Sequence, residues 1–378
     1  MSNWKQHADV STPAPSCVSG GEKPVRTLSI ESIRERLQLI HAHGIKNVRV
    51  LDRTFNYNPR RAKELLRLFL EFHPDIRFHL EIHPDIRFHL EIHPALLSEE
   101  LKEELSLLPK GLLHLEAGIQ SLREPVLEKS RRMGKLSDAL DGLRFLCALP
   151  NMETHADLIA GLPLYHLHEI FEDVRTLAGY AAGEIQLESL KLLPGTEMRR
   201  RAEELGIKYS PLPPYEVLQT HEISVSELQT ARQLSRLLDG FYNTPAWQAL
   251  TRELILNDEQ FLHRFLAYLT KANLIDQPMS LEKRGLILYE FCKQNYPEYQ
   301  IQAAIAWIEA GMSLKKLPAE KVWTKRQIPP ATWNIIYGEY KESLRLCFLP
   351  ADEKGEHGYW FGFESEIQKA SPVFKART

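Results

Sequence analysis

Two stretches, LLHLEAGIQS (residues 112–121) and HADLIAGLP (residues 155–163), decide the fold. Each is a short apolar run that ends in a glycine-containing turn, and residues 122–146 between them have the spacing of an amphipathic helix. A strand, a helix and a second strand in this order predict a βαβ unit of a parallel sheet. In such sheets the groups that bind ligands gather at the carboxyl ends of the strands.

The same alternation continues on both sides of this unit. A Ser29 cap and the stop at Gly44 bound one predicted helix, and a second begins at Pro59 behind Asn58. The predicted strands are residues 45–51, 88–92, 112–117, 154–159 and 184–190. The other predicted helices are residues 97–107, 122–146, 166–179 and 196–206.

The alternation ceases beyond the proline-rich residues 211–214. Long helical patterns follow at residues 216–239, 245–271, 281–296 and 299–311, and an aromatic, strand-like segment lies at residues 359–363. The sequence therefore predicts an N-terminal tail (1–28), an α/β domain with an incomplete parallel (β/α) barrel (29–212) and a mainly helical C-terminal domain (213–378).

Composition limits the possible partners and compartments. The net charge is −3, which argues against binding nucleic acid through bulk charge. Residues 1–14 lack the apolar core of a signal peptide, and no apolar run is long enough to span a membrane. The four cysteines, at positions 17, 147, 292 and 347, form no disulfide framework, and the fifteen histidines show no metal-ligand spacing. We expect a cytoplasmic protein.

A ten-residue segment, HPDIRFHLEI, occurs twice in tandem, at residues 73–82 and 83–92. A barrel needs only one third strand, so one copy is surplus. We predict that the second copy forms the strand, because it keeps the link through His93 and Pro94 into the next helix.

The strand-end phrases together resemble radical S-adenosylmethionine (SAM) enzymes, and in particular the cobalamin-binding branch with a C-terminal domain of unknown function. The phrases are VRTLSIESI (25–33), LDRTFNYNPRRA (51–62), FHLEIHPALLSEEL (88–101), LLHLEAGIQS (112–121), HADLIAGLP (155–163), LESLKLLPGTEM (187–198) and PPYEVLQT (213–220). The resemblance implies a partial (β/α) barrel with a 4Fe-4S cluster, held by a CxxxCxxC loop after the first strand. It also implies that SAM binds this cluster and is cleaved reductively to a radical; the substrate is unknown.

The resemblance assigns cofactor-binding roles at the strand ends. Glu91 and Asp157 match carboxylates near the ribose or methionine part of SAM, Gln120 matches a hydrogen-bonding side chain, and Arg131 or Arg132 matches a guanidinium that pairs with a carboxylate. Each has a structural alternative: a helix cap for Glu91, a loop hydrogen bond for Gln120 and a solvated charge for one of the arginines.

Asp52, Thr54 and Asn56 stand where relatives carry a glycine-rich contact to the cofactor amine. Because this segment is polar and lacks those glycines, we expect it to serve the substrate.

The cluster loop departs from the family pattern. Cys17 matches its last cysteine, the metal ligand, but Ala14 and Val10 occupy the other two positions, and neither has a donor atom. Residues 1–9 are too few and too polar for a buried first strand, and we expect the chain to lack the cobalamin-binding domain that precedes this strand in the family. We therefore expect residues 45–51 to be an unpaired edge strand.

These departures leave three interpretations open. The chain is a radical enzyme that a separate polypeptide with the cobalamin site or cluster loop completes, a degenerate paralogue that still binds SAM, or an interaction scaffold whose helical half is the working part.

Overall fold

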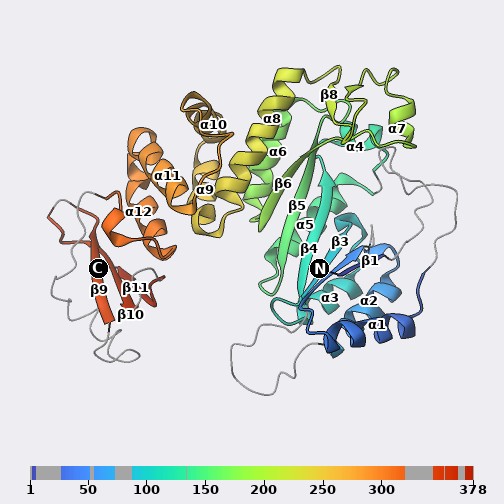
Figure 1. Cartoon of the computed structure of the whole chain (residues 1–378), viewed down its shortest axis with the longest axis horizontal. Coiled ribbons are helices and arrows are strands. Elements are labelled where there is room, and N and C mark those ends of the chain that lie inside the picture. Colours follow the sequence, from blue (N-terminus) through green and yellow to red (C-terminus); the bar gives the residue numbers. More distant parts are fainter. Residues whose placement is uncertain are drawn as a thin grey trace. The chain divides into compact units, whose positions relative to one another are not determined.

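The computed structural model describes residues 2–5, 27–51, 55–72, 87–132, 134–319, 344–352, 354–364 and 371–377 (Figure 1). The chain forms two compact units, Met1–Leu238 and Asp239–Thr378. The predicted division into domains at residue 212 concerns independent folding and stays a prediction.

The first unit is built on a six-stranded sheet in which every pair of neighbours is parallel. The strands follow one another in chain order: β1 (Ser2–Lys5), β2 (Asn47–Leu51), β3 (Arg87–Ile92), β4 (Leu113–Gln120), β5 (Glu153–Ala160) and β6 (Glu184–Ser189). The predicted fold class, a parallel α/β partial barrel followed by a helical region, is confirmed.

The prediction for the N-terminus is wrong. Residues 2–5 form β1 and pair with β2, from Ser2 beside Val48 to Lys5 beside Leu51, so β2 is not an edge strand. A strand that is buried on both faces of a parallel sheet has a nearly continuous apolar sequence, and residues 1–9 contain no such run. An edge strand has a sheet neighbour on one side only, and its four residues need only the backbone hydrogen bonds of that neighbour. Hydrophobicity therefore did not reveal it.

Helices alternate with these strands: α1 (Ile30–Ala42), α2 (Pro59–Glu71), α3 (Glu99–Leu107), α4 (Glu124–Lys129), α5 (Leu136–Ala148) and α6 (Leu167–Gly179). The side chains of Ser29 and Asn58 accept the backbone N–H groups of Ser32 and Arg61, which confirms both predicted caps. The single helix predicted at residues 122–146 is two helices. Arg131 and Gly134, which separate them, have φ angles of 47° and 81° that no α-helix contains.

The core lies between the helices and one face of the sheet. Strand positions alternate between buried and partly exposed; in β3, Phe88, Leu90 and Ile92 are buried and the residues between them are partly exposed. The buried face carries Val48, Phe88, Leu90, Leu115, Ala156, Leu158 and Ile185. The helices contribute Ile33, Leu37, Leu65, Leu66, Leu101, Leu143 and Val174.

After β6 the chain forms α7 (Glu197–Arg200), a small antiparallel pair of β7 (Lys208–Tyr209) and β8 (Val217–Gln219), and α8 (Val225–Leu237), which packs against β6 and α6. The helix predicted to start at residue 216 therefore starts at Val225. Two single-turn helices, η1 (Phe55–Tyr57) and η2 (Pro94–Leu96), follow β2 and β3.

In its described residues, the second unit has four α-helices and a small sheet. A π-helical turn, η3 (Leu238–Tyr242), precedes α9 (Pro245–Asn257), α10 (Phe261–Lys271), α11 (Leu281–Asn295) and α12 (Gln300–Glu309), with short turns η4 (Pro297–Tyr299) and η5 (Leu314–Lys316). The strands β9 (Leu344–Pro350), β10 (Gly358–Glu364) and β11 (Phe374–Arg377) are antiparallel in the order β11-β10-β9. None of the helices in the described ranges is long and apolar enough to cross a membrane.

The second copy of the repeat supplies β3, as predicted. The first copy, residues 73–82, lies outside the described residues. Glu91, and not Glu81, is therefore the glutamate of the third strand.

We expect deletion of residues 73–82 to leave the fold intact. The deletion keeps the whole sequence of β3 and shortens the connection from Glu71 to Arg87 to about a third of its length, which lowers the entropy cost of closing it by about 1 kcal/mol. Urea denaturation followed by circular dichroism should show an equal or slightly higher free energy of unfolding.

A variant with a ten-residue Gly/Ser segment in place of residues 73–82 is the matched control, because it keeps the length and removes the repeat. It should unfold like the wild type. Loss of the cooperative transition in both variants would show that the first copy is needed in the sheet.

Candidate functional site

The second face of the sheet, the inner face of the partial barrel, carries polar side chains on four strands. Positions that pair in a parallel sheet share a face, so the register gathers side chains distant in sequence. One row joins Glu91, Glu116, His155 and Glu184 across β3–β6. The next row, nearer the carboxyl ends, joins Gly118, Asp157 and Gln186.

Asp157 is the central side chain of this second row. Its Oδ1 atom is enclosed and accepts no hydrogen bond from the residues that the structure describes. Burial, together with the negative charges of Glu116, Glu91 and Glu188, raises the pKa of Asp157 to about 7, although the charge of Arg132 acts to lower it. Near neutral pH this carboxyl group can therefore both hold and release a proton.

Arg132 enters the same row through the space that Gly118 leaves. Its Nη2 donates to the carbonyl oxygen of Gly118. A Cβ atom on Gly118 would lie 3.3 Å from that Nη2, so a larger residue would crowd the guanidinium. Arg132 and Gly118 also line a small pocket with His93 and Lys135.

The other predicted cofactor residues are placed as follows. Glu91 is in the row next to Asp157, and Gln120 ends β4 with a φ of 70°, just after a register shift. Arg131 forms an ion pair with Glu197 at 2.8 Å, and its side chain is 47% exposed. The structure thus brings Asp157 and Arg132 together, whereas Arg131 pairs with Glu197 on α7. Their roles in cofactor binding stay predictions.

Asn56 has a partner for both ends of its amide. Its Nδ2 donates to the carbonyl oxygen of His93 at 2.8 Å, and its Oδ1 accepts the His93 backbone N–H at 2.9 Å. This buried side chain fastens the segment after β2 to the segment after β3. Asp52, Thr54 and Cys17 lie outside the described residues, so a substrate role for residues 52–56 stays a prediction.

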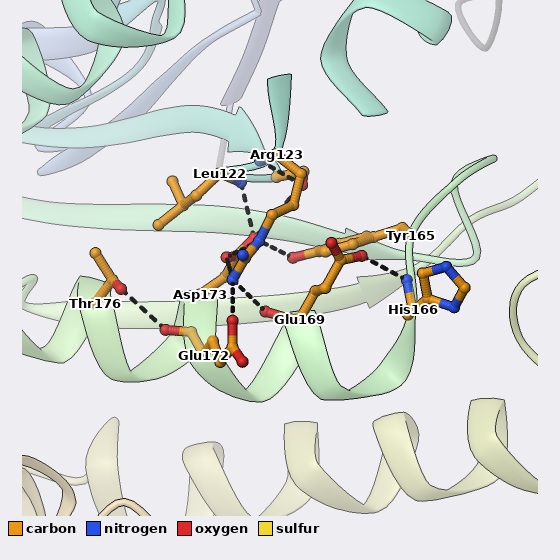
Figure 2. A network of polar contacts seen from close by, with 9 residues as sticks. Leu122, Arg123, Tyr165, His166, Glu169, Glu172, Asp173 and Thr176 are labelled. Carbon is orange, nitrogen blue, oxygen red and sulfur yellow. Dashed lines mark hydrogen bonds and ion pairs between the residues drawn. The ribbon is translucent and has the colours of Figure 1, made fainter. Parts of the chain in front are cut away.

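A buried network around Asp173 holds two strand-end turns together (Figure 2). Asp173, on α6 and 1% exposed, accepts the Leu122 backbone N–H (2.8 Å), the Arg123 Nε–H (2.8 Å) and the Tyr165 hydroxyl (2.6 Å). Arg123 also pairs with Glu172 at 2.8 Å. The turn after β4 is thereby fixed to the turn after β5.

Sequence reasoning missed this network, although a signal was present. Ile170, Val174 and Leu177 form the apolar face of α6, and Asp173 lies on that face, three residues after Ile170 and four before Leu177. A charged residue on an apolar helix face requires a buried partner.

Three histidines lie side by side near the amino ends of the strands. The ring centroids of His89 and His114 are 4.7 Å apart, and those of His114 and His155 are 4.2 Å apart. Burial, and then the positive charges nearby, lower the pKa of His114 to about 4 and that of His155 to about 3. In the described part of the chain no group of three or more His, Cys, Asp or Glu side chains is arranged to hold a metal ion.

The described cysteines are free thiols far apart in sequence, at positions 147, 292 and 347. Burial raises the pKa of Cys147 to about 11 and that of Cys292 to about 12. Both stay protonated at neutral pH, and a thiol has to be deprotonated to bind iron.

We expect stability to fall as the pH is lowered from about 6.5 toward 4. The folded chain keeps His114 and His155 neutral in this range, whereas the unfolded chain binds protons at their ordinary pKa of 6.5. One imidazole contributes at most about 1.4 kcal/mol per pH unit. Urea denaturation at a series of pH values measures the slope.

Asp157 acts in the opposite direction, since its raised pKa lets the folded chain bind a proton below about pH 7. The comparison is therefore made in an Asp157→Asn background, with and without His114→Gln and His155→Gln. A slope that stays the same after both histidines are removed would refute the assignment.

Comparisons with known proteins agree with the family prediction. Residues 9–177 match the radical SAM superfamily, and residues 203–325 match a family described as a protein of unknown function (DUF4080). None of the curated proteins matches the chain.

Several solved structures are similar. TsrM from Kitasatospora setae, a radical SAM methyltransferase with cobalamin and a [4Fe-4S] cluster bound, is 20% identical over 60% of this chain and 42% of that chain, with a TM-score of 0.46. OxsB, a cobalamin-dependent SAM radical enzyme, is 12% identical over 83% and 56%, with a TM-score of 0.46. Elp3 from the archaeon Methanocaldococcus infernus is 12% identical over 99% and 76%, with a TM-score of 0.41.

The chain thus spans less than half the length of the TsrM structure. The expectation that this chain lacks the cobalamin-binding domain of the family stays a prediction. The first match includes strands β2–β5 of the sheet, and the second includes the elements from β7 to α12. The chain therefore carries a radical SAM domain, in residues 9–177, followed by a region of the DUF4080 family, in residues 203–325.

Proposed function

We propose that the chain binds SAM at the carboxyl ends of β3–β5 and takes part in its reductive cleavage. The observation that carries the proposal is the enclosed Asp157 oxygen without a partner among the described residues, beside a guanidinium in the same row. SAM has a sulfonium and an ammonium group that carboxylates attract, and a carboxylate that Arg can bind. The site offers both kinds of partner.

Each site residue has a proposed part in holding the cofactor. Asp157 and Glu91 face the positive groups or the ribose hydroxyls, and Gln120 hydrogen-bonds at the end of β4. We assign the SAM carboxylate to Arg132, whose contact with Gly118 places it in the row of Asp157, and not to the alternative, Arg131, which pairs with Glu197. When bound, SAM supplies the carbon–sulfur bond that an electron breaks to give a radical.

The iron–sulfur cluster does not fit the residues present. The family places its three thiolates in the connection after the first strand, which here joins β1 to α1 and contains Cys17. Positions 10 and 14 hold Val10 and Ala14, which cannot bind iron. The described cysteines, at positions 147, 292 and 347, belong to no group of three or more potential metal ligands. We propose that a separate polypeptide completes the cluster.

We expect SAM to bind the isolated chain, and Asp157→Asn and Arg132→Gln each to weaken binding about tenfold, the effect of losing one hydrogen bond to a charged group. Affinity for SAM should rise as the pH increases through about 7, because the ionised form of Asp157 attracts the sulfonium. The pH dependence should vanish in Asp157→Asn. Isothermal titration calorimetry measures both effects.

Arg131→Gln is the matched control, since it removes a neighbouring guanidinium that pairs with Glu197. It should leave affinity unchanged. Equal affinity in the wild type, Asp157→Asn and Arg132→Gln would place SAM elsewhere or remove it from the function.

Anaerobic reconstitution with iron and sulfide should give no stoichiometric cluster and no 5′-deoxyadenosine, because one cysteine cannot replace three thiolates. The double variant Val10→Cys, Ala14→Cys should gain iron. Iron and sulfide analysis with product chromatography makes the comparison. Four iron atoms per wild-type chain, together with SAM cleavage, would overturn the need for a second polypeptide.

A further inference from the structure

A line of hydrogen-bonding side chains crosses the inner face of the sheet near the amino ends of β3–β6. At its outer end, Glu153 is 66% exposed and ion-paired with Arg87. His114 Nδ1 lies 2.8 Å from Arg87 Nη2 and 3.4 Å from Glu153 Oε2. The Nε2 atoms of His114 and His155 are in hydrogen-bond contact, and the amide of Gln186 lies 2.9 Å from His155 Nδ1.

Proton counting gives this line two satisfied arrangements. A neutral imidazole has one N–H and one acceptor nitrogen, Arg is only a donor, and the two ends of a Gln amide can exchange places. In the first arrangement Arg87 donates to His114, His114 to His155, and His155 to the oxygen of Gln186. In the second, the nitrogen of Gln186 donates to His155, His155 to His114, and His114 to Glu153.

The two arrangements differ in the direction of the hydrogen bonds that join His114, His155 and Gln186, in the orientation of the Gln186 amide, and in the outer partner of His114, which is Arg87 in the first and Glu153 in the second. Passing one proton along the line converts one into the other. A proton taken up at His114 Nδ1 moves the Nε2 proton of His114 to His155 Nε2. His155 then gives its Nδ1 proton to a water molecule in the barrel, and this water delivers a proton to the ionised Asp157 carboxylate. One proton enters and one leaves, and no electrons move.

We propose that His114 and His155 form a proton relay between Glu153 at the surface and the interior of the barrel beside Asp157. The role of this relay rests on the proposed function. Radical chemistry requires bulk water to be kept out of the open end of the barrel, so protons need another route to the interior. The relay reaches the interior from the opposite, amino end of the strands.

The position of Asp157 makes it the group that the relay serves. His155 and Asp157 are two residues apart on β5 and so face the same side, and Gln186, which contacts His155, is the sheet partner of Asp157. Asp157 is also the carboxyl whose raised pKa lets it exchange a proton near neutrality.

The surroundings keep the two rings neutral, as a relay requires. Arg87 and His89 oppose a further positive charge on His114, and burial opposes it on both rings. Two carboxylates lie near the Nδ1 atoms of these rings: Glu153 is 3.4 Å from that of His114, and Glu184 is 3.9 Å from that of His155. Glu116 is hydrogen-bonded to Arg49 at 2.8 Å.

The test is the rate at which the Asp157 carboxyl exchanges its proton for deuterium. Below its pKa of about 7 the protonated group has an infrared C=O band, which Asp157→Asn identifies by its loss. After transfer into D2O, we expect His114→Gln, His155→Gln and Glu153→Gln to slow the shift of this band, the histidine variants by about a hundredfold. Neither SAM nor a cluster is present, so failure of the proposed function leaves this result unaffected.

His89→Gln is the matched control, because His89 packs against His114 without belonging to the line of hydrogen bonds described above. It should exchange at the wild-type rate. Glu153→Gln, at an exposed position, keeps the test open if a buried histidine variant does not fold. Wild-type exchange in every folded variant, or equal slowing in His89→Gln, would overturn the relay.

Discussion

The constraint on which the first unit depends is the parallel pairing of β3–β6, with side chains alternating between two faces. One face meets helices and is apolar, with Phe88 and Leu115 fully buried. The other face cannot become apolar without losing its ligand groups, so its charges have to find partners within the barrel. Arg49 with Glu116 and Arg87 with Glu153 are such pairs. Asp157 Oδ1 has no comparable partner within the described residues, and the burial of this carboxyl group raises its pKa.

A second constraint fixes the turns that follow the strands. Polar backbone groups at strand ends are no longer paired in the sheet and need other partners. Asp173 provides them for the turn after β4, and Asn56 provides them at His93 after β3. Both side chains are buried, and each fixes its turn through hydrogen bonds made inside the protein. Preorganised turns suit a site that has to hold a flexible cofactor, because ordering the turn then costs nothing at binding.

The sequence predicts the central strands and their polar ends because each carries its own apolar run and turn. It does not predict β1, whose four residues are recognised as a strand only through their pairing with β2. His114 and His155 were missed because 41 residues separate them, and only the register of β4 and β5 brings them together. The sequence alone does not distinguish the roles of Arg131 and Arg132. The φ of 47° at Arg131 belongs to a turn that directs the two neighbours to different partners, Glu197 and Gly118.

The distribution of donors also separates the two halves of a radical SAM site. The part that would grip SAM is built from strand ends in the described sheet, and its carboxylates and guanidinium are present together. The part that would hold iron depends on the connection between β1 and α1, where Val10 and Ala14 have no donor atoms. Ligand identity cannot be replaced by proximity, because iron needs thiolate, imidazole or carboxylate groups at bonding distance. On the proposed function, SAM binding and cluster binding are therefore assigned to different parts of this chain.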